Sequence, residues 1–175
     1  MSRISPIMQI QDPPAQRPED RYSRLENLKV ILGRSPVTLQ AYSQWLKLYE
    51  EVERILGTRL ASLYAHSISR AADCPLCSAF FGKVIAEAGE DPGRPAVTSS
   101  QAKLLELGNS IARHHGNVAD HVYEAAAVQF SEAEMIVLLA FAGEMIAISV
   151  LNNVIETEVD KSLLDYLPYA GNHRV

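Results

Sequence analysis

The sequence predicts an all-α protein with a single helical domain, and three observations lead to this fold class. Apolar residues recur at three- and four-residue steps over most of the chain, which is the period of an amphipathic helix. Helix-capping patterns and glycines bound these segments. No segment alternates apolar and polar residues in the way that is typical of a half-buried strand.

Length and charge narrow the class of protein. At 175 residues with 47% hydrophobic content, the chain is long enough to fill one sizeable core. A net charge of -5 gives no attraction to phosphate backbones or to anionic lipid, so we expect neither nucleic acid nor a membrane as a partner. The N-terminus lacks the apolar core of a signal peptide, which predicts a cytoplasmic protein.

The first 24 residues differ in composition from the rest of the chain. Four prolines lie there among polar and charged residues. Such a segment cannot bury enough apolar surface to offset its chain entropy. We therefore predict a flexible N-terminal arm over residues 1–24, or a strap over a partner subunit, followed by one helical domain over residues 25–175.

Caps and periodicity predict the first helices. Ser35 followed by Pro36 is a helix start, and Gly57 ends the pattern that follows. The apolar residues between them are Leu39, Tyr42, Leu46, Tyr49, Val52 and Leu56. Thr58 then caps a second helix over residues 59–72.

The next three helices follow from breaks in the pattern. A helix starts at Cys74, with Asp73 as its expected cap, and ends before Gly89. A loop rich in proline and glycine separates it from a helix over residues 100–114, which Thr98 and Gln101 open as a capping box. A shorter helix is expected directly after it.

The longest apolar segment of the chain runs from a capping box at Ser131 and Glu134 to Ile155. It is long enough to cross a bilayer, for which about 20 residues are needed, but Glu144 lies near its centre and no basic clusters flank it. A helix that is apolar nearly all round is otherwise buried in a core and against another subunit. We therefore predict a homo-oligomer whose interface includes this helix.

Cys74 and Cys77 are the only cysteines and form a CxxC motif. In a reducing compartment, two cysteines favour redox chemistry or metal binding over a permanent disulfide. No second CxxC and no nearby histidine pair completes a tetrahedral site, so we expect no metal. Residues at i and i+3 share a helix face, and a helix N-terminus stabilises an anion, so this pair suits a dithiol.

The order of these features carries a family resemblance. A helix from Thr58 leads to an acidic residue, a CxxC that opens a helix, a Pro/Gly loop, a helix pair and a long apolar helix ending in LNNVIETEVD. Over about residues 36–160, this arrangement resembles the carboxymuconolactone decarboxylase and alkylhydroperoxidase AhpD-like family. The resemblance implies an oligomeric AhpD-like helical fold of about six helices, and we expect no cofactor.

The peroxidase members of that family imply an antioxidant mechanism. A thiolate of the CxxC attacks a hydroperoxide and becomes a sulfenic acid, which the other cysteine resolves to a redox-active disulfide. A thiol reductant then restores the dithiol. By analogy, Cys77 is the attacking thiol and Cys74 the resolving thiol.

The chain departs from the family pattern at the proton relay. The peroxidase members carry a Glu one helix earlier and a His four residues after the second cysteine, and these take the proton from the attacking thiol. The corresponding positions here are Ser62 and Phe81, and Leu76 stands where some members have a His between the cysteines. The two phenylalanines behind the motif also raise a thiol pKa by excluding water. We therefore expect a degenerate relay and slow peroxide reduction.

His66 is the candidate replacement for the missing base. It lies four residues after Ser62, on the same helical face and one turn nearer the cysteines. Its imidazole suits the removal of a thiol proton. The alternative is a histidine bonded to backbone or water. Glu144 has two interpretations, a partner of a Lys or Arg on a neighbouring helix or a member of the site.

Three functions stay open at this point. The first is a thiol-dependent, peroxidase-like oxidoreductase of the AhpD type, with a small-molecule peroxide or a disulfide as substrate and a thiol reductant. The second is a lyase acting on a lactone acid, as in the decarboxylase branch, which needs Arg or His for its anionic substrate. The third is a non-enzymatic oligomer that uses the cysteines for packing or as a redox-sensitive staple. The CxxC with Pro75 favours the first.

Overall fold

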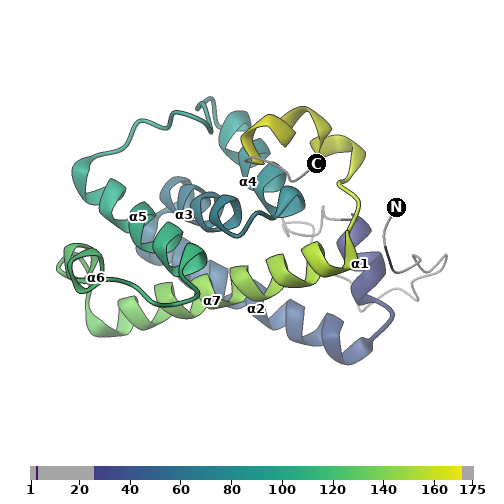
Figure 1. Ribbon diagram of the computed structural model, residues 1–175, viewed down its shortest axis with the longest axis horizontal. Helices are drawn as coiled ribbons and strands as arrows, with labels where there is room; N and C mark the ends of the chain where they lie inside the picture. The colour runs from purple at the N-terminus through teal and green to yellow at the C-terminus, as the bar shows by residue number, and fades with distance from the viewer. Residues whose placement is uncertain (1–2, 4–25, 171–175) are drawn as a thin grey trace.

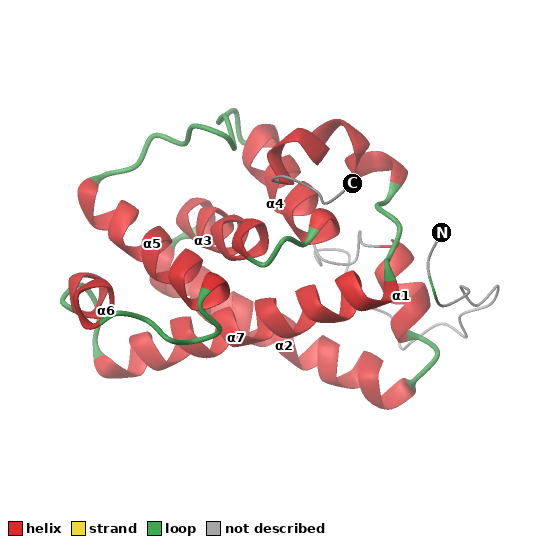
Figure 2. Ribbon diagram, viewed as in Figure 1, coloured by secondary structure: helices red, strands yellow, loops and turns green. Residues whose placement is uncertain are grey.

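The computed structural model describes residue 3 and residues 26–170, and every regular element in that part of the chain is a helix (Figures 1 and 2). The helices are α1 (Glu26–Leu32), α2 (Pro36–Leu56), α3 (Thr58–Ala71), α4 (Pro75–Glu87), α5 (Ser99–Arg113), α6 (Asp120–Ala127), α7 (Glu132–Ile155) and the 3-10 helix η2 (Lys161–Ala170). The prediction of an all-α protein is confirmed for these residues.

Two of these helices lie beyond the six that the sequence predicts. The first, α1, has seven residues, which is too short to show a repeating apolar stripe. The other, η2, is a 3-10 helix, and its period differs from the one that reveals an α-helix. The predicted arm over residues 1–24 lies outside the described residues, apart from Arg3. That residue donates its main-chain N–H to the carbonyl of Ile155 at 2.7 Å.

The predicted caps of the longer helices form as expected. Ser35 accepts from the N–H of Thr38 at 3.3 Å at the start of α2. Both capping boxes, Thr98 with Gln101 and Ser131 with Glu134, are closed in both directions. These local signals place the starts of α2, α5 and α7 within one residue of the prediction.

Two predicted caps are wrong. The residue before α3 is Gly57, and no side chain caps that helix. Asp73 is exposed and has a left-handed backbone, with φ of 49°, in the turn between α3 and α4. Aspartate tolerates this conformation better than most residues, which suits it to the turn. The cap of α4 is Cys74, whose backbone is extended and whose sulfur accepts the N–H of Cys77.

The centre of the fold is α3, which packs against α2, α4, α5 and α7. The side chain of Tyr64 is fully buried, and its hydroxyl donates to the carbonyl of Leu138 on α7 at 3.2 Å. Figure 1 shows α2 and α7 crossing each other, and the two helices are in contact. The cysteine helix α4 packs on α3 on one side and on η2 on another.

The contact between α3 and α5 depends on Gly108. A Cβ atom added there would lie 2.6 Å from a ring carbon of Tyr64 and 2.9 Å from Ile68. We expect Gly108→Ala to lower the free energy of unfolding by about 1–3 kcal/mol, because overpacking a core forces side chains and backbone to shift. Urea unfolding measures this loss.

Gly143→Ala is the matched control, because outside its own helix turn no described residue lies within 4 Å of a Cβ added at that helical position. It should leave the folded monomer equally stable or more stable by up to about 1 kcal/mol, which is the difference in helix propensity. Equal effects of the two substitutions would contradict the predicted packing of α5 on α3.

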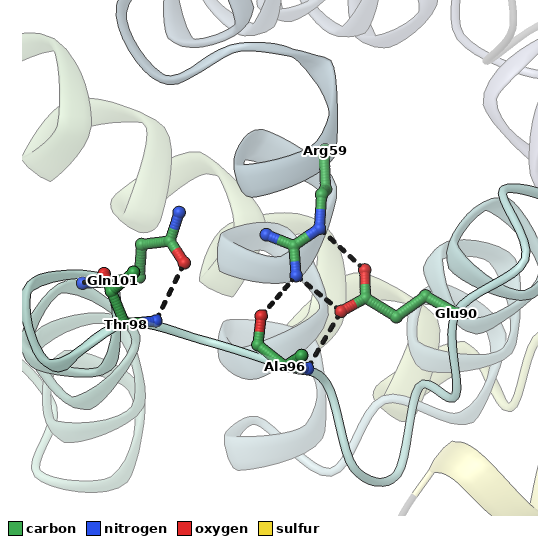
Figure 3. Close-up of polar contacts among 5 residues, drawn as sticks. All are labelled: Arg59, Glu90, Ala96, Thr98 and Gln101. Atoms are coloured by element: carbon green, nitrogen blue, oxygen red, sulfur yellow. Dashed lines mark hydrogen bonds and ion pairs between the residues drawn. The ribbon is translucent and has the colours of Figure 1, made fainter.

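The loop between α4 and α5 is fastened to α3 by Arg59 (Figure 3). The guanidinium donates to both carboxylate oxygens of Glu90 and to the carbonyl of Ala96. Glu90 in turn accepts the N–H of Ala96 at 3.0 Å. Thr98 and Gln101 then open α5, so the Pro/Gly loop is held at both of its ends.

One side of α7 is exposed and apolar. Its residues follow steps of four and three along the helix and are Ile136, Ala140, Gly143, Ala147, Val150 and Val154. We call this set the α7 stripe. Among the described residues, α7 is the one helix long and apolar enough to cross a membrane, a property it shares with core helices of soluble proteins. Its opposite side is buried in the core.

Candidate functional site

The two cysteine thiols lie together at the start of α4, as the i and i+3 spacing predicts. Both are free thiols, with Cys74 fully buried and Cys77 4% exposed. Cys74 is the N-cap, so its sulfur accepts the main-chain N–H of Cys77 at 3.4 Å. A helix N-terminus favours a negative charge at this position.

Two polar residues of α7 complete the surroundings of the sulfurs. The side-chain amide of Asn152 donates to the sulfur of Cys77 at 3.5 Å and to that of Cys74 at 3.9 Å. The hydroxyl of Ser149 donates to the carbonyl of Met145 at 2.6 Å, and Ser149 also lowers the pKa of both thiols. Sequence reasoning missed both residues. Both are polar residues near the end of an otherwise apolar helix, and this pattern could have pointed to them in the sequence.

The two thiols share their protons unequally. Burial raises the pKa of the Cys74 thiol, but hydrogen bonds from Cys77, Ser149 and Asn152 outweigh burial and bring that pKa below its ordinary value. The Cys77 thiol donates to Cys74 and is itself buried, and both effects raise its pKa well above the ordinary value. The pair therefore gives up one proton more easily than the second.

A small cavity lies beside Cys77, between α1, α2, α4 and α7. Its volume is about 50 Å³. Six aromatic side chains line it, namely Tyr42, Trp45, Tyr49, Phe80, Phe81 and Phe141. Cys77 forms part of the wall, whereas Cys74 does not line the cavity. Of the two thiols, Cys77 is thus the one that a small molecule in this cavity would meet.

The two positions of the missing relay lie on either side of Tyr49. The hydroxyl of Ser62 donates to the carbonyl of Thr58 at 2.9 Å and lies 3.3 Å from the hydroxyl of Tyr49. The Tyr49 ring in turn lies 6.1 Å from that of Phe81, and both rings line the cavity. Sequence reasoning placed Tyr49 only in the apolar stripe of its helix and missed its position beside the thiols.

His66 lies on α3 and is 4% exposed. Among the described residues, those that donate hydrogen bonds to the two sulfurs are Cys77, through its main-chain N–H, and Asn152. His66 is not one of them, and it does not line the cavity. Its role as the base for Cys77 stays a prediction.

No family model matches the chain, and no curated protein or solved structure matches it either. Within the residues that the structure describes, no three His, Cys, Asp or Glu side chains lie close enough together to hold a metal ion. The functional assignment below therefore depends on the residues of this site and on the resemblance in sequence.

Glu144 is the carboxylic acid of the site. It lines the same cavity as Cys77, and its buried Oε2 has no hydrogen-bond partner among the residues that the structure describes. No lysine or arginine of residues 26–170 forms an ion pair with it, so the expected cationic partner is not seen there. Burial alone raises the pKa of Glu144 to about 7.

This raised pKa predicts how stability depends on pH. The contribution of Glu144 to the free energy of unfolding is fully present below its unfolded pKa and is lost as the pH rises through about 7. We expect Glu144→Gln to remove this loss, so that the variant gains stability relative to wild type between about pH 5 and about pH 8. Urea unfolding at both pH values measures the difference.

Glu132→Gln is the control for this prediction, because Glu132 is an exposed carboxylate of the same helix. It should change stability equally at the two pH values. A Glu144→Gln variant with the pH dependence of wild type would show that this carboxyl is not held in its uncharged form.

Proposed function

We propose that the protein is a thiol-dependent oxidoreductase of the AhpD-like type, which reduces a peroxide at the dithiol of Cys74 and Cys77. The observation that carries this proposal is a pair of free thiols at one helix start beside a cavity that Cys77 lines and Cys74 does not. The order of the helices around the CxxC supports the AhpD-like assignment of the fold.

Two properties assign the roles of the two cysteines, namely which of them lines the cavity and how the pKa of each thiol is shifted. Cys77 is the attacking thiol, because it lines the cavity. Its pKa is raised well above the ordinary value, first by Cys74 and then by burial, so its proton must pass to a base before the attack, and Cys74, whose pKa is lowered, is the thiolate beside it. Cys74 therefore serves as the base for Cys77 before it serves as the resolving thiol. This arrangement supplies one part of the proton relay that Ser62 and Phe81 cannot supply.

The reaction balances without a cofactor. The Cys77 sulfur bonds the terminal peroxide oxygen, the O–O bond breaks, and the departing alkoxide takes a proton to become an alcohol. The Cys74 sulfur then attacks the sulfenic acid on Cys77, and the oxygen leaves as water. The disulfide that results returns to two thiols at the expense of a dithiol reductant.

The cavity fits the other two functions less well. A lyase acting on a lactone acid needs a cation for its substrate, and no Arg, Lys or His lines the cavity within the described part of the chain. The burial of both sulfurs favours, as the second candidate, a non-enzymatic protein in which the cysteines only pack. A test of peroxide reduction distinguishes this candidate from the first.

The direct test is a stopped-flow measurement of thiol oxidation in the reduced, full-length protein. Oxidation should be first order in an alkyl hydroperoxide and should yield an intrachain disulfide. It should be slower by about 10²- to 10⁴-fold than that of an enzyme with a complete acid–base relay. Thiols that stay reduced under excess peroxide would favour the non-enzymatic candidate.

The α7 stripe supports the further proposal that the protein is a homo-oligomer. Ile136, Val150 and Val154 are 67%, 55% and 59% exposed, and the steps of four and three between stripe residues suit the packing of two helices along a seam. We expect wild type to be larger than a monomer in light scattering, and Val150→Glu to shift it toward the monomer. The introduced charge would be buried without a partner.

Val37→Glu is the matched control, since Val37 is 77% exposed on α2 and lies outside the stripe. It should leave the assembly unchanged. A wild-type protein that is monomeric at micromolar concentration would contradict the proposal.

A further inference from the structure

The proposed reaction leaves one proton without a source. Peroxide cleavage at Cys77 releases an alkoxide, and an alkoxide in an apolar cavity is strongly destabilised unless an acid neutralises it at once. The proton of Cys77 has moved to Cys74, which does not line the cavity, and is needed later for the release of water. A second acid must therefore lie within reach of the substrate.

Glu144 is placed to be that acid. It comes from α7, whereas the family pattern places its carboxylate one helix before the cysteines, where this chain has Ser62. It shares the cavity with Cys77, and within the described part of the chain its buried Oε2 has no hydrogen-bond partner, so no protein group there competes for this oxygen. The titratable groups that share this cavity are Tyr42 and Tyr49 of α2 and Cys77 of α4, while α1 contributes only Leu28.

We propose that Glu144 is a catalytic residue of this site, which gives its carboxyl proton to the alkoxide that leaves when Cys77 takes the terminal peroxide oxygen. This inference rests on the proposed function. The proton passes from Oε2 to the alkoxide oxygen, the alcohol departs, and the carboxylate regains a proton from water. The sulfenic acid keeps the hydrogen that the peroxide brought.

The chemical state of Glu144 suits this step. Burial raises its pKa to about 7, so a large fraction of the carboxyl carries a proton at neutral pH. General acids work best when their pKa lies near the working pH. No lysine, arginine or histidine lines the cavity in the described residues, so no cation there competes for the carboxylate.

The cavity also guides the choice of the test molecule. A cavity of about 150 Å³ holds benzene, so one of about 50 Å³ suits a peroxide with a short alkyl group. Ethyl hydroperoxide is therefore the probe. Trp45, the only tryptophan of the chain, lines the same cavity, so its fluorescence reports oxidation at Cys77.

The experiment compares wild type, Glu144→Gln and the control Glu132→Gln in single-turnover oxidation across pH. The Gln variant should react about 10²-fold more slowly below pH 7, the lower part of the range for general acid catalysis. The wild-type rate should level off or fall as the pH rises through about 7, because Glu144 loses its proton there. The oxidation rate of Glu144→Gln should show no such levelling or fall, whereas that of Glu132→Gln should show it.

Two further measurements separate catalysis from structure. Oxidised dithiothreitol should form the Cys74–Cys77 disulfide equally in wild type and Glu144→Gln, because a thiolate leaving group needs no acid. Glu144→Asp keeps an ionisable carboxyl. Its oxidation by ethyl hydroperoxide should be slower than that of wild type, and its rate should still level off or fall as the pH rises. If Glu144→Gln slowed oxidation by ethyl hydroperoxide and by oxidised dithiothreitol to the same extent, the inference would be overturned in favour of a structural role for Glu144.

The outcomes for the two proposals are distinct. A Glu144→Gln variant with the rate and pH profile of wild type overturns the role of Glu144 and leaves the proposed function standing. A wild-type protein that ethyl hydroperoxide does not oxidise overturns the proposed function and this inference with it.

Discussion

Cys77→Ser should abolish both peroxide reduction and disulfide formation, whereas Cys74→Ser should still allow one slow oxidation. The difference follows from the cavity, because Cys77 lines it and Cys74 does not. In Cys74→Ser, the oxidised Cys77 stays a sulfenic acid, since no second sulfur resolves it. Its formation should be slower than in wild type, because serine is a poor acceptor for the Cys77 proton.

Mass spectrometry after peroxide treatment distinguishes the two variants. Cys74→Ser should gain one oxygen atom on the peptide that holds Cys77, and a sulfenic-acid reagent should trap it. Cys77→Ser should gain none under the same conditions. A sulfenic acid that forms on Cys74 instead would reverse the assignment of attacking and resolving thiols.

Asn152→Leu should lower the oxidation rate at neutral pH by about 10- to 150-fold. Its amide donates to both sulfurs, and a hydrogen bond to a charged group contributes about 1.5–3 kcal/mol. Leucine has nearly the same size but no donor, so the first pKa of the dithiol should rise. The ultraviolet absorbance of the thiolate, titrated with pH, measures that rise.

Asn153→Leu is the matched control, because its amide donates to the carbonyl of Ala72 at 3.0 Å. Asn153 is not among the hydrogen-bond partners of the sulfurs. Its replacement should lower stability slightly and leave the thiol titration unchanged. Equal thiolate titrations in wild type and Asn152→Leu would show that the amide does not stabilise the thiolate.

The parts of the fold that local chemistry specifies could be predicted from the sequence. Ser35, Thr98 and Ser131 cap their helices through residues three positions away, and such short-range bonds are visible in a sequence. The cap of α4 was misplaced by one residue, because Asp73 has the chemistry of a cap but occupies a left-handed turn. Whether Asp73 or Cys74 becomes the cap depends on the direction in which the chain leaves α3, and a sequence does not show that direction.

The candidate site was predictable only where its residues are neighbours in sequence. Cys74 and Cys77 meet because they lie three positions apart at one helix end. Asn152 and Ser149 reach the sulfurs from a helix about 75 residues away, which depends on how α7 packs against the rest of the core. Glu144 was visible as a carboxylate in an apolar helix, but its place on the cavity wall follows from packing alone.

The central claim is that Cys74 and Cys77 form a working dithiol with access to a peroxide through Cys77. It is tested most directly when the reduced, full-length protein is mixed with ethyl hydroperoxide, and ethanol and the Cys74–Cys77 disulfide are both quantified. We expect one molecule of ethanol for each disulfide, and a further round after a dithiol reductant is added. Peroxide that remains intact beside two unreacted thiols would contradict the claim.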